Sequence, residues 1–280
     1  MDTYQDIIVE TASFITTITL NRPAKLNAWT PLMADEVSHA IHQAGDSPAT
    51  RCIVITGAGR GFCAGADMGR LQDRADSSEP GTHKTVHQTD AGFPGAPGPD
   101  VARYYPGRFG YLCACPKPII AAINGACAGV GLVLALYADM RFTCDSAKFT
   151  TAFAARGLIA EHGVAALLPR LVGEAQALDL LLTARRFTGA EAAELRLVNK
   201  SLTDEMLMDH VYSVARMLAN DVSPLSVAVI KRQVRAAHEQ SFAESLAAAD
   251  AEMDRSFTSF DFKEGVKSFV ERRAPAFKGV

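Results

Sequence analysis

Short runs of Ile, Val and Thr alternate with amphipathic stretches over roughly the first half of the chain. The runs predict β-strands at residues 7–10, 14–20, 51–56, 117–124 and 140–143. Apolar residues at helical spacing predict helices between them, at 31–45 and 129–138. Thr30 and Pro31 form a typical N-cap and first residue for the earlier helix. This alternation predicts a layered α/β fold with mostly parallel strands.

After about Leu202 the pattern becomes helical throughout. Leu207, Val211, Ala215 and Leu218 share one face at helical spacing. Three more helices are predicted at residues 224–238, 242–254 and 261–272. We therefore expect a core over residues 1–202 and a C-terminal helical region over 203–280.

A segment rich in Ser, Pro, Gly, Asp and His interrupts the core at about residues 75–110. This composition predicts a long inserted loop, and long loops inside compact domains are usually functional or disordered. Two interpretations are open. The loop forms part of the roof of a substrate pocket, or it is a surface loop with no role in binding.

Composition and charge narrow the class of protein. A hydrophobic content of 48% is enough for a sizeable core, and a net charge of −3 gives no reason to expect nucleic acid or an anionic membrane surface. The start of the chain lacks a signal-peptide pattern, and no apolar run approaches the roughly 20 residues of a membrane span. The six cysteines are scattered, as reduced thiols are. We expect a cytoplasmic protein with no membrane partner.

Metal binding finds little support in the sequence. Cys113 and Cys115 are too close for an ordinary disulfide, and a zinc pair is the weaker explanation of their spacing. His83 and His87 have the i, i+4 spacing of some zinc ligands, but no third ligand is evident nearby. We expect no metal site.

Two turns of small residues, at 61–67 and 123–131, each follow a predicted strand and lead toward a helix. Such turns leave backbone N–H groups accessible because little side-chain bulk surrounds them. Two converging turns of this kind can hold one oxyanion between two N–H donors. They predict acyl chemistry on an activated carbonyl.

The same turns carry a family resemblance. Residues 63–67 and 124–131 resemble the two oxyanion segments of the crotonase (enoyl-CoA hydratase/isomerase) superfamily. The resemblance extends to its first CoA-contacting segment at 20–28 and its C-terminal signature at 262–265, 269–273 and 277–279. It covers nearly the whole chain. It implies a spiral of ββα turns, a C-terminal helical trimerisation region, and a homotrimer or a dimer of trimers.

The resemblance implies that the backbone N–H groups of Ala66 and Val130 are the oxyanion donors. Hydratases of the family use two glutamates, and the matching positions here are Val133 and Phe153, which cannot ionise. Glu161 aligns with a site where some isomerases of the family carry a catalytic Glu or Asp. One carboxylate suffices for a 1,3-proton shift, because it can remove a proton from C2 and return it at C4.

Glu161 and its neighbour each have a second interpretation. A carboxylate before a helix is also a common N-terminal cap, so Glu161 has a purely structural alternative. His162 is a candidate acid/base partner or an orienter of Glu161, and its alternative is an ordinary structural histidine.

The resemblance also implies contacts with coenzyme A, which enters as part of the thioester substrate and is not a permanently bound cofactor. The implied contact residues are Ala24, Lys25, Leu26, Ala64, Asp67, Phe262 and Lys278. Phe262 would pack near the adenine, from a neighbouring subunit. Asp67 also fits an ordinary helix cap, and each lysine also fits a solvated surface charge. Trp29 either lines the acyl pocket or packs in the core.

These residues predict an acyl-CoA enzyme that stabilises a thioester enolate and shifts a double bond, similar to a Δ3,Δ2-enoyl-CoA isomerase, with Glu161 as the acid/base. A 2-enoyl-CoA hydratase is the first alternative, and it would need Glu161 and His162 in place of the two missing glutamates. A non-catalytic acyl-CoA-binding paralogue is the second, because both hydratase glutamates are absent.

Overall fold

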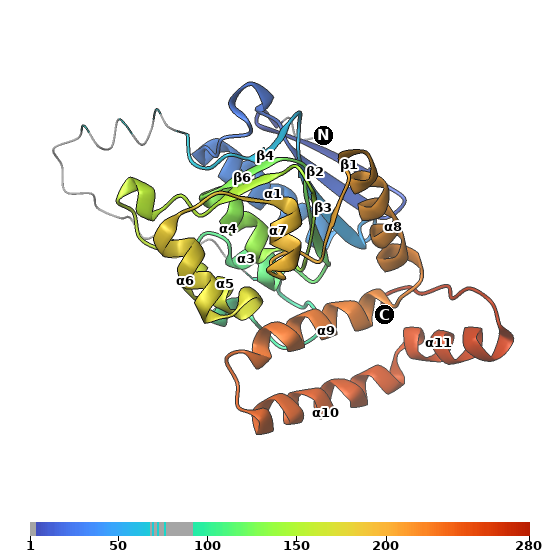
Figure 1. The fold of residues 1–280 in the computed structure, drawn as a ribbon. Coiled ribbons are helices and arrows are strands. Elements are labelled where there is room, and N and C mark those ends of the chain that lie inside the picture. The colour runs from blue at the N-terminus through green and yellow to red at the C-terminus, as the bar shows by residue number, and fades with distance from the viewer. Residues whose placement is uncertain (1–3, 68, 70–71, 73–75, 77–91) are drawn as a thin grey trace.

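The computed structural model describes residues 4–67, 69, 72, 76 and 92–280 (Figure 1). Its centre contains a six-stranded sheet of order β1-β2-β3-β5-β7-β10 and a four-stranded sheet of order β4-β6-β8-β9. The strands are β1 (Ile7–Ala12), β2 (Ile15–Leu20), β3 (Cys52–Gly57), β4 (Gly61–Cys63), β5 (Ile119–Ile123), β6 (Ala126–Ala128), β7 (Met140–Cys144), β8 (Lys148–Thr150), β9 (Phe187–Thr188) and β10 (Lys200–Leu202). Only the β1–β2 and β8–β9 pairs are antiparallel.

Helices surround the larger sheet and continue beyond it. They are α1 (Pro31–Asp46), α3 (Gly110–Ala114), α4 (Val130–Tyr137), α5 (Val164–Val172), α6 (Glu174–Thr183), α7 (Gly189–Glu194), α8 (Leu207–Asn220), α9 (Pro224–Ala237), α10 (Phe242–Thr258) and α11 (Phe260–Glu271). Helix α8 packs across β2, β3, β5 and β7, and α1 packs on β1 and β2. In Figure 1, α10 and α11 extend beyond α9, away from the sheets.

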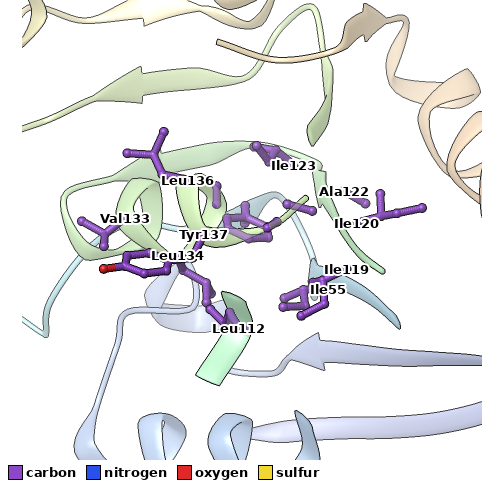
Figure 2. Packing of buried hydrophobic residues seen from close by; sticks show 14 of the residues in the cluster. Ile55, Leu112, Ile119, Ile120, Ala122, Ile123, Val133, Leu134, Leu136 and Tyr137 are labelled. Atoms are coloured by element: carbon purple, nitrogen blue, oxygen red, sulfur yellow. The ribbon is translucent and has the colours of Figure 1, made fainter. Parts of the chain in front are cut away.

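The core lies where the parallel strands meet α3 and α4. Strands β3 and β5 are buried along their whole length, as expected for parallel strands covered on both faces. Every residue of α4 is buried, so this helix is apolar all round. Figure 2 shows Leu112 of α3, Ile119 and Ile120 of β5, and Leu134 of α4 in this cluster.

A buried ion cluster fastens α9 to the core. Asp139, just before β7, accepts Lys231 Nζ at 2.8 Å and Arg235 Nη2 at 3.2 Å. Lys231 Nζ also donates to two backbone carbonyls, both at 3.0 Å. Charges this well paired and hydrogen-bonded can be buried, whereas the loss of one partner would leave an uncompensated charge.

The predicted strands and helices are confirmed, with ends that shift by a few residues. Thr30 caps α1 as predicted, since its side chain accepts the N–H of Met33 at 3.0 Å. The smaller sheet was not predicted, because its strands are only two or three residues long and show no clear periodicity.

Part of the segment predicted as an inserted loop packs into the core. Its buried residues are Phe93, Val101, Tyr105 and Phe109. The ring of Phe93 stacks on His42 of α1 with 5.0 Å between the ring centroids. Residues 92–110 therefore combine a loop-like composition with apolar anchors, while residues 77–91 lie outside the described part of the chain.

Candidate functional site

The two small-residue turns lie side by side. Strands β4 and β6 precede them and pair in parallel, with Cys63 opposite Cys127. Both turns therefore leave the smaller sheet at the same end. A Cβ placed on Gly65 would lie only 3.2 Å from the carbonyl oxygen of Ala128, so the two backbones are nearly in contact.

The backbone N–H of Ala66 points away from the neighbouring segment, which contains Trp29. It forms an isolated parallel bridge with Trp29. The Trp29 N–H donates to the Gly65 carbonyl at 2.8 Å, and the Asp67 N–H donates to the Trp29 carbonyl at 3.2 Å. Gly65 and Asp67, on either side of Ala66, thus both hydrogen-bond to Trp29. In a parallel pair, the residue between two such neighbours points its own N–H away from the paired strand. The Ala66 N–H therefore points away from Trp29.

Val130 is the first residue of α4, after Gly129 with a φ of 50°. The first N–H groups of a helix have no partner within it, and the helix dipole favours negative charge there. The ladder begins with the Val133 N–H, which donates to the Gly129 carbonyl at 3.0 Å. The predicted oxyanion donors, Ala66 and Val130, thus lie on neighbouring turns, and their convergence on one oxyanion stays a prediction.

Glu161 and His162 form a close pair before α5. His162 Nε2 lies 3.5 Å from Glu161 Oε2, and about a quarter of each side chain is exposed (25% and 27%). The N-cap of α5 is Gly163, with no side-chain cap. Glu161 is therefore not the capping residue of α5: its backbone carbonyl accepts the Val164 N–H at 3.1 Å, and a favourable charge near the start of the helix stays its structural alternative.

Phe109 connects this pair to the small-residue turns. Its ring centroid lies 5.6 Å from that of His162, 5.7 Å from that of Tyr137 and 5.8 Å from that of Trp29. Trp29 is bridged to Ala66, so one chain of contacts leads from the first turn to the carboxylate. Trp29 is buried, as its core-packing interpretation expects, and its lining of an acyl pocket stays a prediction.

The sequence reasoning missed Phe109, because the surrounding Gly and Pro residues suggested only a loop. A signal was present: Val101, Tyr105 and Phe109 follow one another at four-residue spacing, and all three are buried. Val133 and Phe153, which the resemblance matches to the hydratase glutamates, are also buried, with 0% and 5% exposure.

The first predicted CoA segment lies against the first turn. The Ala64 N–H donates to the Leu26 carbonyl at 3.0 Å, while Ala24 and Lys25 are exposed. Leu26 and Ala64 line a groove of about 570 Å³. The groove also contains three basic residues that the sequence reasoning missed, Lys148, Arg156 and Arg186.

The Asp67 side chain forms hydrogen bonds with the first predicted CoA segment and with its own turn. Its Oδ2 accepts both Nη1 and Nη2 of Arg22 at 3.1 Å, and its Oδ1 accepts the Gly69 N–H at 3.1 Å. These hydrogen bonds, first the one from Arg22, lower the pKa of the Asp67 carboxyl. Asp67 therefore has a structural partner in Arg22, a residue that the sequence reasoning did not single out.

Phe262 and Lys278 lie apart from the other candidates. The C-terminal tail is held by Arg51, whose Nη2 donates to the Phe277 carbonyl at 2.8 Å. Arg51 precedes β3, whereas Leu26 follows the opposite end of the neighbouring parallel strand β2. Within one chain, the structure does not bring Phe262 and Lys278 to the groove at Leu26.

The described cysteines are free and buried. Burial raises the pKa of the Cys113 thiol to about 11. Among the described residues, no three His, Cys, Asp or Glu side chains form a metal-binding group, and His83 and His87 lie outside that part of the chain. None of the described helices combines the length and apolar character needed to cross a membrane.

Comparison with known proteins identifies the family of the chain. The sequence model of the enoyl-CoA hydratase/isomerase family matches residues 10–91 and 107–280. The 1,2-epoxyphenylacetyl-CoA isomerase of Escherichia coli (strain K12) is 35% identical over 95% of both chains. The peroxisomal Delta(3,5)-Delta(2,4)-dienoyl-CoA isomerase of Arabidopsis thaliana is 29% identical over 99% of this chain and 98% of its own.

Solved structures agree as well. The crystal structure of an enoyl-CoA hydratase from Bacillus anthracis superimposes with a TM-score of 0.85 at 28% identity, covering 99% of this chain and 100% of that one. The fold, the paired turns and the extent of these matches lead to one conclusion. The chain belongs to the enoyl-CoA hydratase/isomerase family of the crotonase superfamily.

Proposed function

We propose that this protein shifts a carbon–carbon double bond within an acyl-CoA thioester, from the 3-enoyl to the 2-enoyl position, with Glu161 as the acid/base. The observation that carries the proposal is the chain of contacts from Ala66 through Trp29 and Phe109 to His162. It links the backbone donors to a turn that carries a carboxylate. Two relatives named as acyl-CoA isomerases support the reaction class.

The proposed reaction needs one base and two donors. The Glu161 carboxylate removes a proton from C2 of the 3-enoyl thioester, and the electron pair moves toward the thioester oxygen to give a dienolate. The N–H groups of Ala66 and Val130 stabilise the developing charge, by about 3–4 kcal/mol for each donor. Glu161 then returns the proton at C4, which leaves a 2-enoyl thioester and restores the carboxylate.

The residues at the hydratase positions support isomerisation over hydration. Val133 and Phe153 are buried and apolar. An ordered water needs two to four polar partners, and neither side chain offers one. A proton shift between two carbons requires no such water.

We further propose that CoA lies along the groove at Leu26 and Ala64. Lys148, Arg156 and Arg186 line that groove, and guanidinium and ammonium groups suit phosphate oxygens. Lys25 is exposed nearby in sequence and adds a fourth cation. Since Phe262 and Lys278 lie elsewhere in the same chain, they would reach CoA from a neighbouring subunit of a homotrimer or a dimer of trimers.

The test follows the turnover of 3-enoyl-CoA and 2-enoyl-CoA side by side with the wild type and Glu161→Gln. The wild type should convert the 3-enoyl ester to the 2-enoyl ester, and Glu161→Gln should lower this rate by at least about 100-fold, as general acid–base catalysis contributes 10²–10⁴-fold. Glu174→Gln, an exposed glutamate at the start of α6, is the matched control and should be unchanged.

The close Glu161–His162 pair keeps hydration as a second candidate, because two proton-handling groups could replace the absent glutamates. Rapid hydration of 2-enoyl-CoA, lost in Glu161→Gln, would establish that activity and overturn the isomerase proposal. Tight binding of both esters without turnover would instead indicate an acyl-CoA-binding protein.

A further inference from the structure

The two residues after Glu161 have an unusual backbone conformation. His162 has a φ of 53° and Gly163 a φ of 76°, so two consecutive residues lie in the left-handed region. Glycine adopts this region freely, but histidine has a Cβ and does so only when its surroundings hold it there. The orientation of Glu161 relative to α5 therefore depends on what fixes the His162 peptide.

Tyr137 supplies such a contact. Its hydroxyl donates to the His162 carbonyl at 3.0 Å, and its ring packs on Phe109, which also contacts the His162 ring. A Cβ on Gly163 would lie 3.0 Å from the Tyr137 hydroxyl, so the absence of a side chain there permits this close approach. Burial raises the pKa of Tyr137 to about 12, which keeps the hydroxyl protonated and able to donate.

Helix α4 lies between the proposed oxyanion donor and the turn that carries Glu161. Its first residue, Val130, carries the proposed backbone donor, and its last residue, Tyr137, holds the carbonyl of His162, the residue after Glu161. Eight residues of α-helix span about 12 Å and form a rigid rod. The helix would thus fix the distance between the thioester oxygen, bound at Val130, and the Glu161 carboxylate.

We propose that Tyr137 is a positioning residue: it sets the Glu161 carboxylate relative to the thioester held by Val130. The inference rests on the proposed function and deepens it. Tyr137 acts through the His162 peptide and does not itself transfer a proton. A misplacement of about 1 Å can cost a factor of 100 in rate, so a single distant hydrogen bond can control turnover.

The test compares Tyr137→Phe with Tyr105→Phe. Both tyrosines are buried, and each donates to a backbone carbonyl at 3.0 Å, but the acceptor of Tyr105 is Arg235 on α9. The two variants should lose similar thermal stability. Tyr137→Phe should lower kcat roughly 10- to 100-fold with little change in KM, and Tyr105→Phe should leave both unchanged. The kcat ratio of wild type to Tyr137→Phe should stay constant from pH 6 to pH 9, because the hydroxyl does not titrate there.

A double mutant separates positioning from general destabilisation. If Tyr137 acts through Glu161, then adding Tyr137→Phe to Glu161→Gln should leave the residual rate unchanged, because the two effects are not additive. Equal kcat values for Tyr137→Phe and wild type, with Glu161→Gln inactive, would overturn this inference and leave the proposed function intact. Full activity of Glu161→Gln would overturn the proposed function itself.

Gly163→Ala provides a second variant if Tyr137→Phe does not fold. It crowds the same hydroxyl and strains a φ of 76°. A fall in kcat at unchanged KM would again support the inference, and an unchanged kcat would contradict it.

Discussion

Ala66 and Val130 would act through backbone N–H groups, so their side chains need no chemistry of their own. What they require is a local conformation. Ala66 obtains it from a parallel bridge with Trp29, and Val130 from its place after Gly129 at the start of α4. The small-residue pattern predicts the two turns, and the family resemblance assigns the donors to these two positions. The bridge to Trp29 is not predictable in this way, because it joins segments far apart in the sequence.

The Trp29 side chain packs against Phe109. It is 5% exposed, and its indole N–H has no hydrogen-bond partner in the described part of the chain. Burying an unpaired donor costs about 1–3 kcal/mol. Trp29→Phe removes that donor and keeps an aromatic ring. We therefore expect its free energy of unfolding to lie within about 1 kcal/mol of the wild type, since the gain offsets the lost volume.

Trp29→Ala is the comparison variant. It also removes the ring contact with Phe109 at 5.8 Å. Losses of about 3–5 kcal/mol are typical when such a ring is truncated. Urea denaturation of both variants measures the difference. Equal losses for Trp29→Phe and Trp29→Ala would mean that the indole N–H makes a stabilising hydrogen bond.

Among the elements, α11 and the tail after it depend on two carboxylates. Asp261 accepts the backbone N–H groups of Lys278, at 2.8 Å, and Gly279, at 3.1 Å. Glu264 accepts Arg273 Nη2 at 2.9 Å and the Ala276 N–H at 2.7 Å. Both carboxylates are largely buried beneath the tail that they hold. The extended tail is therefore ordered by charge-assisted hydrogen bonds, which are stronger than neutral ones.

The docking of this tail should depend on pH. The hydrogen bonds from Arg273, followed by the Ala276 N–H, lower the pKa of Glu264 from 4.5 to about 2. A carboxyl whose pKa is depressed in the folded state stabilises that state fully above its unfolded pKa. We expect this contribution to be present above about pH 4.5 and to be lost as the pH falls through about 2.

The chemical shift of the Ala276 amide, followed by NMR, reports this titration directly. In the wild type it should change with a midpoint near pH 2, and Glu264→Gln should abolish the change. Glu271→Gln is the matched control: Glu271 also pairs with Arg273, at 2.7 Å, but does not accept the Ala276 N–H. A wild-type midpoint near 4.5 would show that the tail does not depend on Glu264.

For the whole molecule, the sequence predicts the larger sheet and the C-terminal helices because they consist of long periodic segments. The smaller sheet escapes prediction, since strands such as Gly61–Cys63 exist only through their partners. The same distinction applies to the candidate site. The family resemblance of contiguous motifs proposes Ala66, Val130 and Glu161, whereas Phe109 and Tyr137 come close to them only when distant segments pack together.

Large apolar side chains are exposed on each of the last three helices, and this apolar surface bears on assembly. Its exposed residues are Ile230, Val234, Phe242, Leu246, Met253, Phe257, Val266, Phe269 and Val270. Phe242 and Phe269 are 84% and 85% exposed. Large apolar side chains as exposed as these are candidates for a contact between subunits. Together with the separation of Lys278 from Leu26, this surface supports our proposal that subunits complete each other's CoA sites.

Light scattering should give a mass of three or six times the 29.9 kDa chain. Phe269→Asp places a charge in the apolar surface, so it should reduce this mass toward that of one chain. It should also raise KM for the thioester, because Phe262 and Lys278 would no longer reach a neighbouring groove. Leu182→Asp, at a 71% exposed leucine of α6, is the matched control and should change neither mass nor KM. A wild type that is monomeric yet binds the thioester fully would contradict the shared site, since Phe262 and Lys278 lie apart from Leu26 within one chain.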